Sequence, residues 1–187
     1  AKKNNLPYTF VSWWTNTLFA FYEYNWIIIK NNLRWYEYNE VTKMLKISSQ
    51  ELIRDISLIL KEKYKNDLWY RFIWLPGSIG WAVSGNAWCF WLETENNFVS
   101  CEVYNMESRQ IENLNKEQMN FWYRSSILKE TWKYFLINAI FDLSKIIEKY
   151  SNDKDVLKFR EEVQPKWNCC WSFFKNPNKD FSAWKLL

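Results

Sequence analysis

The sequence contains no histidine, and this absence removes several common kinds of active site. Without an imidazole there is no base for a Ser-His-Asp or Cys-His nucleophile, and no zinc site with mixed histidine and cysteine ligands. Glycine is almost as scarce, since the 187 residues include only Gly77, Gly80 and Gly85. Neither a G-x-G-x-x-G dinucleotide turn nor a G-x-x-x-x-G-K-[ST] phosphate loop can be formed from them, so we expect no cofactor.

Cysteine occurs at four positions: Cys89, Cys101, Cys169 and Cys170. No two of them have the C-x-x-C spacing of metal sites and thioredoxin-like sites, so we expect no bound metal. If residues 87–93 and 98–104 form paired strands, Cys89 and Cys101 could lie close enough for a disulfide. Strand cysteines are more often inert core residues, and we favour reduced thiols.

Long apolar runs are absent as well. Stretches such as WIIIK and WKYFLINAIFDL are interrupted by Lys, Asn or Asp well before the roughly 20 apolar residues of a membrane-spanning helix. The start, AKKNNLPYTF, lacks the long apolar region of a secretory signal. With 48% hydrophobic residues and a mean hydropathy of −0.45, the composition predicts a soluble globular protein, which we place in the cytoplasm or elsewhere inside the cell.

Aromatic residues are abundant instead, with 14 tryptophans, 11 tyrosines and 13 phenylalanines. The length fits one large domain, and we expect residues 1–187 to form a single α+β domain. Aromatic and β-branched residues on both sides of KNN predict a hairpin near 18–41, because Asn tolerates positive φ. The alternative for this segment is a helix that begins at Ser12.

The middle of the chain predicts helices and strands in turn. SSQELIRDISLILKEKYK predicts an amphipathic helix at about 49–65, with Ser48 and Glu51 as a capping box. LWYRFIWLPG then predicts a strand, GWAVSGNAWCFWLE a hairpin that turns at Gly85 and Asn86, and NNFVSCEVYNM a third run, which together form an antiparallel meander. Helical spacing after this point predicts one long central helix near 115–150, followed by a shorter helix that ends before Pro165. The expected architecture is an antiparallel sheet, made of the N-terminal hairpin and the central meander, packed against amphipathic helices.

The C-terminal segment, residues 164–187, combines aromatic and basic residues. Its four lysines are opposed only by Asp180, so it carries three of the four net positive charges. We expect most of its aromatic rings, Trp167 and Trp171 among them, to pack on the domain, since an exposed patch of that size is rare on soluble monomers. Its end is the candidate partner-binding surface: Lys175, Lys179, Phe181, Trp184 and Lys185.

Three carboxylates could act as acid and base: Glu93, Glu95 and Glu102. Glu93 and Glu95 share a face if their strand continues, and Glu102 lies on the next strand. A restriction-nuclease-like metal site would need Glu-x-Lys on that strand, but CEVYN places Tyr104 where the lysine would stand. We therefore favour an exposed charged strand edge over a catalytic cluster.

The pattern W-x-x-x-W-x-F-F-K-N in the tail resembles the opening strand of the cap-binding translation initiation factors and, equally, aromatic segments of restriction-nuclease-like proteins. In the first family such a segment begins the domain, whereas here it ends the chain, so we carry over no functional residue.

The missing motifs favour a non-catalytic protein-binding module, either an inhibitor or immunity-type protein or a subunit of a larger assembly, rather than an enzyme. The expected partner is another protein, and a small-molecule ligand is not indicated. The alternatives are a nucleic-acid-binding protein that uses aromatic stacking and its basic tail, and a histidine-independent hydrolase or nuclease with a carboxylate site.

Overall fold

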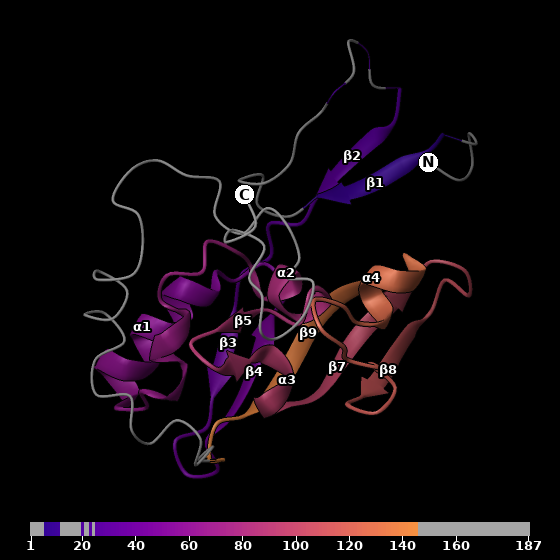
Figure 1. Cartoon of the computed structure of the whole chain (residues 1–187). Coiled ribbons are helices and arrows are strands. Elements are labelled where there is room, and N and C mark those ends of the chain that lie inside the picture. The colour runs from indigo at the N-terminus through magenta and orange to yellow at the C-terminus, as the bar shows by residue number, and fades with distance from the viewer. Residues whose placement is uncertain (1–5, 12–19, 21–22, 24, 146–187) are drawn as a thin grey trace, which may run out of the picture. The chain divides into compact units, whose positions relative to one another are not determined.

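Figure 1 presents the computed structural model of the chain, which describes residues 6–11, 20, 23 and 25–145. Its centre is a five-stranded antiparallel sheet. In spatial order its strands are β3 (Tyr36–Tyr38), β4 (Met44–Ser48), β9 (Tyr134–Asp142), β7 (Phe98–Asn105) and β8 (Ile111–Asn115). The order requires β9, the last strand of the sheet in sequence, to insert between β4 and β7.

The two faces of this sheet differ in polarity. Ile47, Ala139 and Cys101 are neighbours across three strands, and all three are buried. Residues that are paired across strands share a face, so this is the face that meets the core. One position along, Asn138 pairs with Glu102, so the opposite face carries polar side chains beside half-buried apolar ones such as Ile140.

In the described part of the chain, five short helices accompany the sheet: α1 (Ile53–Tyr64), a 3₁₀ helix (Leu68–Phe72), α2 (Ile79–Ser84), α3 (Thr94–Asn97) and α4 (Ile127–Thr131). The stripe Ile53, Ile56 and Leu60 of α1 is buried, as amphipathic spacing requires. Trp69 of the 3₁₀ helix meets Phe141 of β9 edge to face, with ring centroids 4.7 Å apart. The predicted α+β class, an antiparallel sheet packed against helices, is therefore confirmed.

Two small sheets complete the described residues. β1 (Tyr8–Val11) and β2 (Ile27–Lys30) form a parallel pair, and β5 (Trp88–Cys89) and β6 (Leu92–Glu93) an antiparallel pair. Phe10 of β1 stacks on Phe135 of β9 at 4.3 Å. Within the described part of the chain, every helix is too short or too polar to span a bilayer.

The predicted hairpin at 18–41 is wrong. β2 pairs with β1, and β3 pairs with β4. Asn31 is not part of a tight hairpin turn; its side chain accepts a hydrogen bond from the Leu33 N–H and donates another to Ser49 Oγ.

The helix predicted at 49–65 is confirmed as α1, but the capping box is wrong. Ser48 belongs to β4, and its hydroxyl accepts from the Trp35 N–H.

The first half of the predicted meander is helical. The segment predicted as a strand after residue 67 is the 3₁₀ helix, and the first arm of the predicted hairpin is α2. Ser78 caps α2, since its side chain accepts a hydrogen bond from the Trp81 N–H. Gly80 then lies against the adjacent loop, where its N–H donates to the Ser49 carbonyl at 2.7 Å and a β-carbon would lie 3.1 Å from the same oxygen. The second arm of that hairpin contains the two short strands β5 and β6, and the third predicted run is the strand β7.

The long helix predicted near 115–150 is also wrong. Its middle is the short helix α4, and its second half is the nine-residue strand β9. Both structures suit this stretch because nearly every position from Phe135 to Phe141 is apolar, and a central strand has such a continuous run. The sheet supplies hydrogen-bond partners on both sides of β9, which an isolated pattern cannot reveal.

The two cysteines in the described residues, Cys89 and Cys101, are buried thiols, as we favoured. They are not on paired strands, since β5 pairs with β6 and β7 pairs with β8 and β9. The Cys101 thiol donates to Met119 Sδ at 3.6 Å. Burial raises its pKa to about 12, so it stays protonated and unreactive at neutral pH. Cys169 and Cys170 lie outside the described residues.

Tryptophan is unusually exposed in this fold. Nine tryptophans fall in the described residues, and seven of them are exposed, whereas only Trp69 is fully buried. Two of the exposed ones, Trp91 with φ 69° and Trp132 with φ 53°, have left-handed backbone conformations. The β-carbon of an ordinary residue is strained there, and glycine is not.

We expect Trp132→Gly to stabilise the protein. Trp132 is the left-handed residue at the C-terminus of α4, a position that glycine favours, and its side chain is 74% exposed. Relief of about 1 to 2 kcal/mol of strain should exceed the entropy cost of glycine in the unfolded chain, about 0.5 to 1 kcal/mol. Urea unfolding measures the difference. Trp132→Ala is the control, because it removes the indole but keeps the β-carbon, and an equal gain from alanine would contradict the explanation.

Candidate functional site

Asn86 joins three segments of the chain. Its side-chain Nδ2 donates to Glu93 Oε2 at 3.0 Å and to the Trp122 carbonyl at 3.4 Å. Its Oδ1 accepts from the Glu95 N–H at 3.1 Å. The residue is only 2% exposed, so the end of α2, the start of α3 and a turn more than thirty residues away meet at one buried carboxamide.

Local sequence explains how these groups come together. Asn86 follows α2 with φ 42°, a left-handed conformation that Asn adopts more easily than most residues. The β5–β6 hairpin then turns at Phe90 and Trp91, both at positive φ. Glu93 begins α3 as its N-cap, where its N–H donates to Asn96 Oδ1 at 2.7 Å. The hairpin thus brings Glu93 and Glu95 back to Asn86.

Glu93 and Glu95 form a carboxyl pair. Partial burial raises the pKa of Glu95 first, and a hydrogen bond with Glu93 and the negative charge of Glu93 raise it further, while Lys116 opposes them. The negative charge of Glu93 therefore makes the ionisation of Glu95 less favourable. A carboxyl group with a raised pKa is a candidate general acid.

We expect Glu95→Gln to stabilise the protein at neutral pH. Because the folded pKa of Glu95 is raised, the folded state binds its proton more tightly than the unfolded state. Stability from this group is therefore complete below the ordinary value of 4.5 and falls as the pH rises through the folded pKa. Glutamine keeps the hydrogen bond without the charge, so the gain should vanish in urea titrations below pH 4.5. Glu117→Gln, at an exposed turn, is the control, and a gain from Glu95→Gln that is independent of pH would contradict this account.

A basic turn lies beside the acid pair. Trp122 and Ser125 bridge it, and Tyr123 and Arg124 form its tip, with Arg124 at φ 60°. The neighbouring Ser126 hydroxyl donates to the Ser84 carbonyl at 2.9 Å, which ties the turn to the end of α2. Backbone strain of this kind persists only where surrounding contacts fix it, and it is common at functional sites. The arrangement places a carboxyl group with a raised pKa near a turn that carries one cationic residue, Arg124.

The sequence candidates separate in space. Glu93 and Glu95 come together at the α3 terminus rather than along a continuing strand. Glu102 lies elsewhere, on the polar face of the sheet, where it accepts a hydrogen bond from Asn138 Nδ2 and Lys46 Nζ is 4.0 Å away. Its strand, β7, lies between β9 and β8, so Glu102 is not on a sheet edge. The tail candidates lie outside the described residues: Lys175, Lys179, Phe181, Trp184 and Lys185.

Sequence reasoning missed Asn86 as a site residue and the turn that carries Arg124. Asn86 was interpreted only as a turn former, although an Asn after a glycine at the end of a predicted element fits both roles. Nothing local signals the hydrogen bond from Asn86 to the Trp122 carbonyl.

Three curated relatives are reductases. The enzyme of Fervidobacterium nodosum is 38% identical over 110 residues (57% of this chain and 35% of the relative), and that of Bacillus pumilus 36% over 116 residues (58% and 37%). The enzyme of Petrotoga mobilis is 26% identical over 186 residues, which are 96% of this chain and 60% of the relative. All three are named UDP-N-acetylenolpyruvoylglucosamine reductase. No family model matches the chain.

A solved structure agrees on the fold. The crystal structure of the corresponding reductase from Thermus caldophilus superposes with a TM-score of 0.71 at 18% identity, over 99% of this chain and 66% of that one. The chain has the fold of that reductase. It spans between 35% and 60% of the lengths of the three relatives.

The comparisons overturn the functional expectation. The relatives are enzymes, so the interpretation as a non-catalytic protein-binding module, and with it the preference for a non-enzyme, is wrong. Missing motifs misled it, because the absence of histidine and glycine loops excludes particular chemistries and not catalysis as such. The two families that the tail segment resembles are also not those of these relatives. The expected protein partner stays a prediction, as does the single domain over residues 1–187.

Proposed function

We propose that this chain acts inside the cell as part of a UDP-N-acetylenolpyruvoylglucosamine reductase. The observation that carries the proposal is the 38% identity to the Fervidobacterium nodosum enzyme over 110 residues, supported by the common fold.

The chemistry of that substrate suggests roles for the site. An enolpyruvoyl group has a carbon–carbon double bond and a carboxylate. Its reduction adds a hydride to one carbon and a proton to the other. Side chains do not donate hydride, so a redox cofactor or cosubstrate supplies it.

The carboxyl pair at Glu93 and Glu95 could supply the proton, because one of its two groups holds a proton more tightly than an isolated glutamate does. The turn with Arg124 offers positive charge for a substrate that carries a carboxylate and a diphosphate. Asn86 contacts Glu93, Glu95 and the turn, so it would hold the carboxyl pair and the turn in fixed positions relative to each other.

The test is the reaction itself. The complete protein, as its host makes it, is incubated with UDP-N-acetylenolpyruvoylglucosamine and a reduced nicotinamide nucleotide, and the product is analysed by mass spectrometry. We expect a product with two more hydrogen atoms, and a slower rate for Arg124→Met. Arg109→Gln, on the turn between β7 and β8, is the matched control. A folded protein that leaves the substrate unchanged would refute the proposal.

A further inference from the structure

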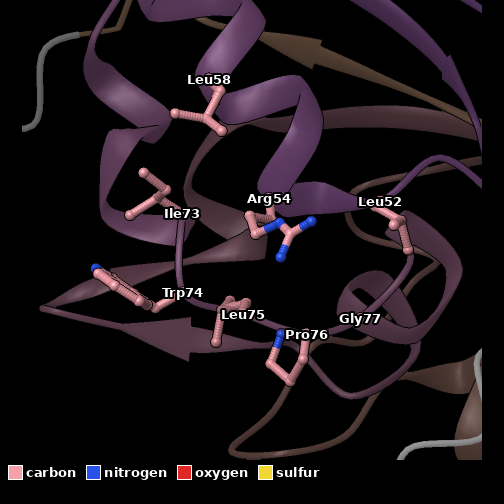
Figure 2. A pocket seen from close by; sticks show the side chains of 8 residues that line it. All are labelled: Leu52, Arg54, Leu58, Ile73, Trp74, Leu75, Pro76 and Gly77. Atoms are coloured by element: carbon pink, nitrogen blue, oxygen red, sulfur yellow. The ribbon is translucent and has the colours of Figure 1, made fainter.

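An apolar groove lies between α1 and the loop that follows the 3₁₀ helix, apart from the site above (Figure 2). Its volume is about 380 Å³, within the range of small-molecule sites. Its walls are apolar: Leu52, Leu58, Ile73, Trp74, Leu75 and Pro76. A groove lined in this way favours the hydrocarbon part of a ligand over water.

One charged side chain lines this groove. Arg54 extends from α1 toward the space between Leu52 and Leu75, as Figure 2 shows. Its Nε donates to Asp55 Oδ1 at 3.1 Å, in an ion pair whose two side chains are 57% and 41% exposed. A guanidinium has five N–H donors, and the contact with Asp55 uses one of them. The contact leaves the two terminal nitrogens unused, and a guanidinium can bind a carboxylate with two parallel hydrogen bonds.

We propose that this groove binds a small ligand with an apolar body and one carboxylate group. The apolar walls take the body, and Arg54 at the rim takes the charge. Among the described residues that line the groove, Arg54 is charged and none carries a carboxylate, so charge complementarity favours an anionic group on the ligand. This inference does not depend on the proposed reductase activity, since none of the residues at the acid pair or the basic turn lines the groove.

A matched pair of probes tests the two halves of the site separately. Phenylbutyrate and phenylbutanol have the same apolar body and differ in the carboxylate. Isothermal titration of the complete protein should show saturable binding of both, with phenylbutyrate the tighter. Arg54→Gln should weaken phenylbutyrate about tenfold, the loss of a charge-assisted contact, and leave phenylbutanol unchanged.

Leu58→Glu should abolish the binding of both probes, since it places a negative charge in the apolar wall. Arg109→Gln removes an arginine elsewhere and should change neither. The proposal is overturned if the wild-type protein shows no saturable binding, or if Arg54→Gln affects both probes equally. It is also overturned if Leu58→Glu changes the oligomeric state instead of probe binding, because the groove would then be a contact between copies of the chain.

Discussion

Trp69→Ala is expected to lower the free energy of unfolding by about 3 to 5 kcal/mol, the range for large aromatic truncations in a core. Trp69 is 1% exposed and meets two aromatic rings edge to face, Phe72 at 5.6 Å and Phe141 at 4.7 Å. Its indole N–H also donates to Asn97 Oδ1 at 3.4 Å. Alanine leaves a cavity between the helical layer and the sheet, and it leaves a buried carboxamide oxygen without this donor.

Urea unfolding of Trp69→Ala beside Trp132→Ala gives the comparison. The second variant loses the same side chain from a position that is 74% exposed, and changes at such sites are usually within about 0.5 kcal/mol. A loss below about 1 kcal/mol for Trp69→Ala would show that the 3₁₀ helix does not belong to the cooperative core.

Asn86→Leu should be the other severe change, with a loss of about 3 to 5 kcal/mol. Leucine has nearly the same shape but removes the Asn86 donor from Glu93 Oε2 and the acceptor from the Glu95 N–H, and each lost partner at these half-buried groups costs about 1 to 3 kcal/mol. Leucine is also strained at the φ of 42°, by about 1 to 2 kcal/mol. The proposed reductase activity should be lost as well, because the Trp122 carbonyl at the turn with Arg124 loses its hydrogen bond to Asn86.

Asn86→Asp tests whether Asn86 is needed for its hydrogen bonds or for its backbone conformation. Aspartate tolerates the left-handed conformation and keeps the acceptor for the Glu95 N–H, but at neutral pH it places a second negative charge against Glu93. We expect this variant to regain stability relative to the wild type as the pH falls, since a protonated carboxyl can donate to Glu93. A deficit that stays constant with pH in urea unfolding would mean that Asn86 is needed for its shape alone.

Residues that form a strong one-sided pattern were interpreted correctly. The buried stripe of α1 is separated from its polar face at helical spacing, so the element follows from Ile53, Ile56 and Leu60 alone. β9 gave no such contrast. Leu136, Ala139 and Phe141 are buried on one face, while Ile137 and Ile140 on the other are half-buried, and a run whose only polar position is Asn138 fits a helix as well as a strand.

α2 and the candidate site depended on contacts between distant segments. The helical conformation of GWAVS is fixed by the Ser78 cap and by the close approach of Gly80 to Ser49, neither of which has a periodic signal. Glu93 and Glu95 were found by residue type, because paired carboxylates suit acid–base chemistry. The group that organises them, Asn86, makes its decisive contact with Trp122, and sequence spacing carries no information about that contact.

The left-handed tryptophans have a consequence for the gene. The tryptophan codon UGG differs from the glycine codon GGG only in its first base, so a single mutation at Trp91 or Trp132 would remove a strained β-carbon. The same mutation at Trp69 would remove the core indole. Selection for stability would therefore favour glycine over tryptophan at the left-handed positions and keep tryptophan at core positions such as Trp69. If the ribosomes of the host read as glycine a codon that is translated here as tryptophan, the protein would carry glycine at every position with that codon. The backbone strain at the left-handed positions among them would then be removed. Peptide masses of the natively expressed protein would then differ from those of the printed sequence at these positions.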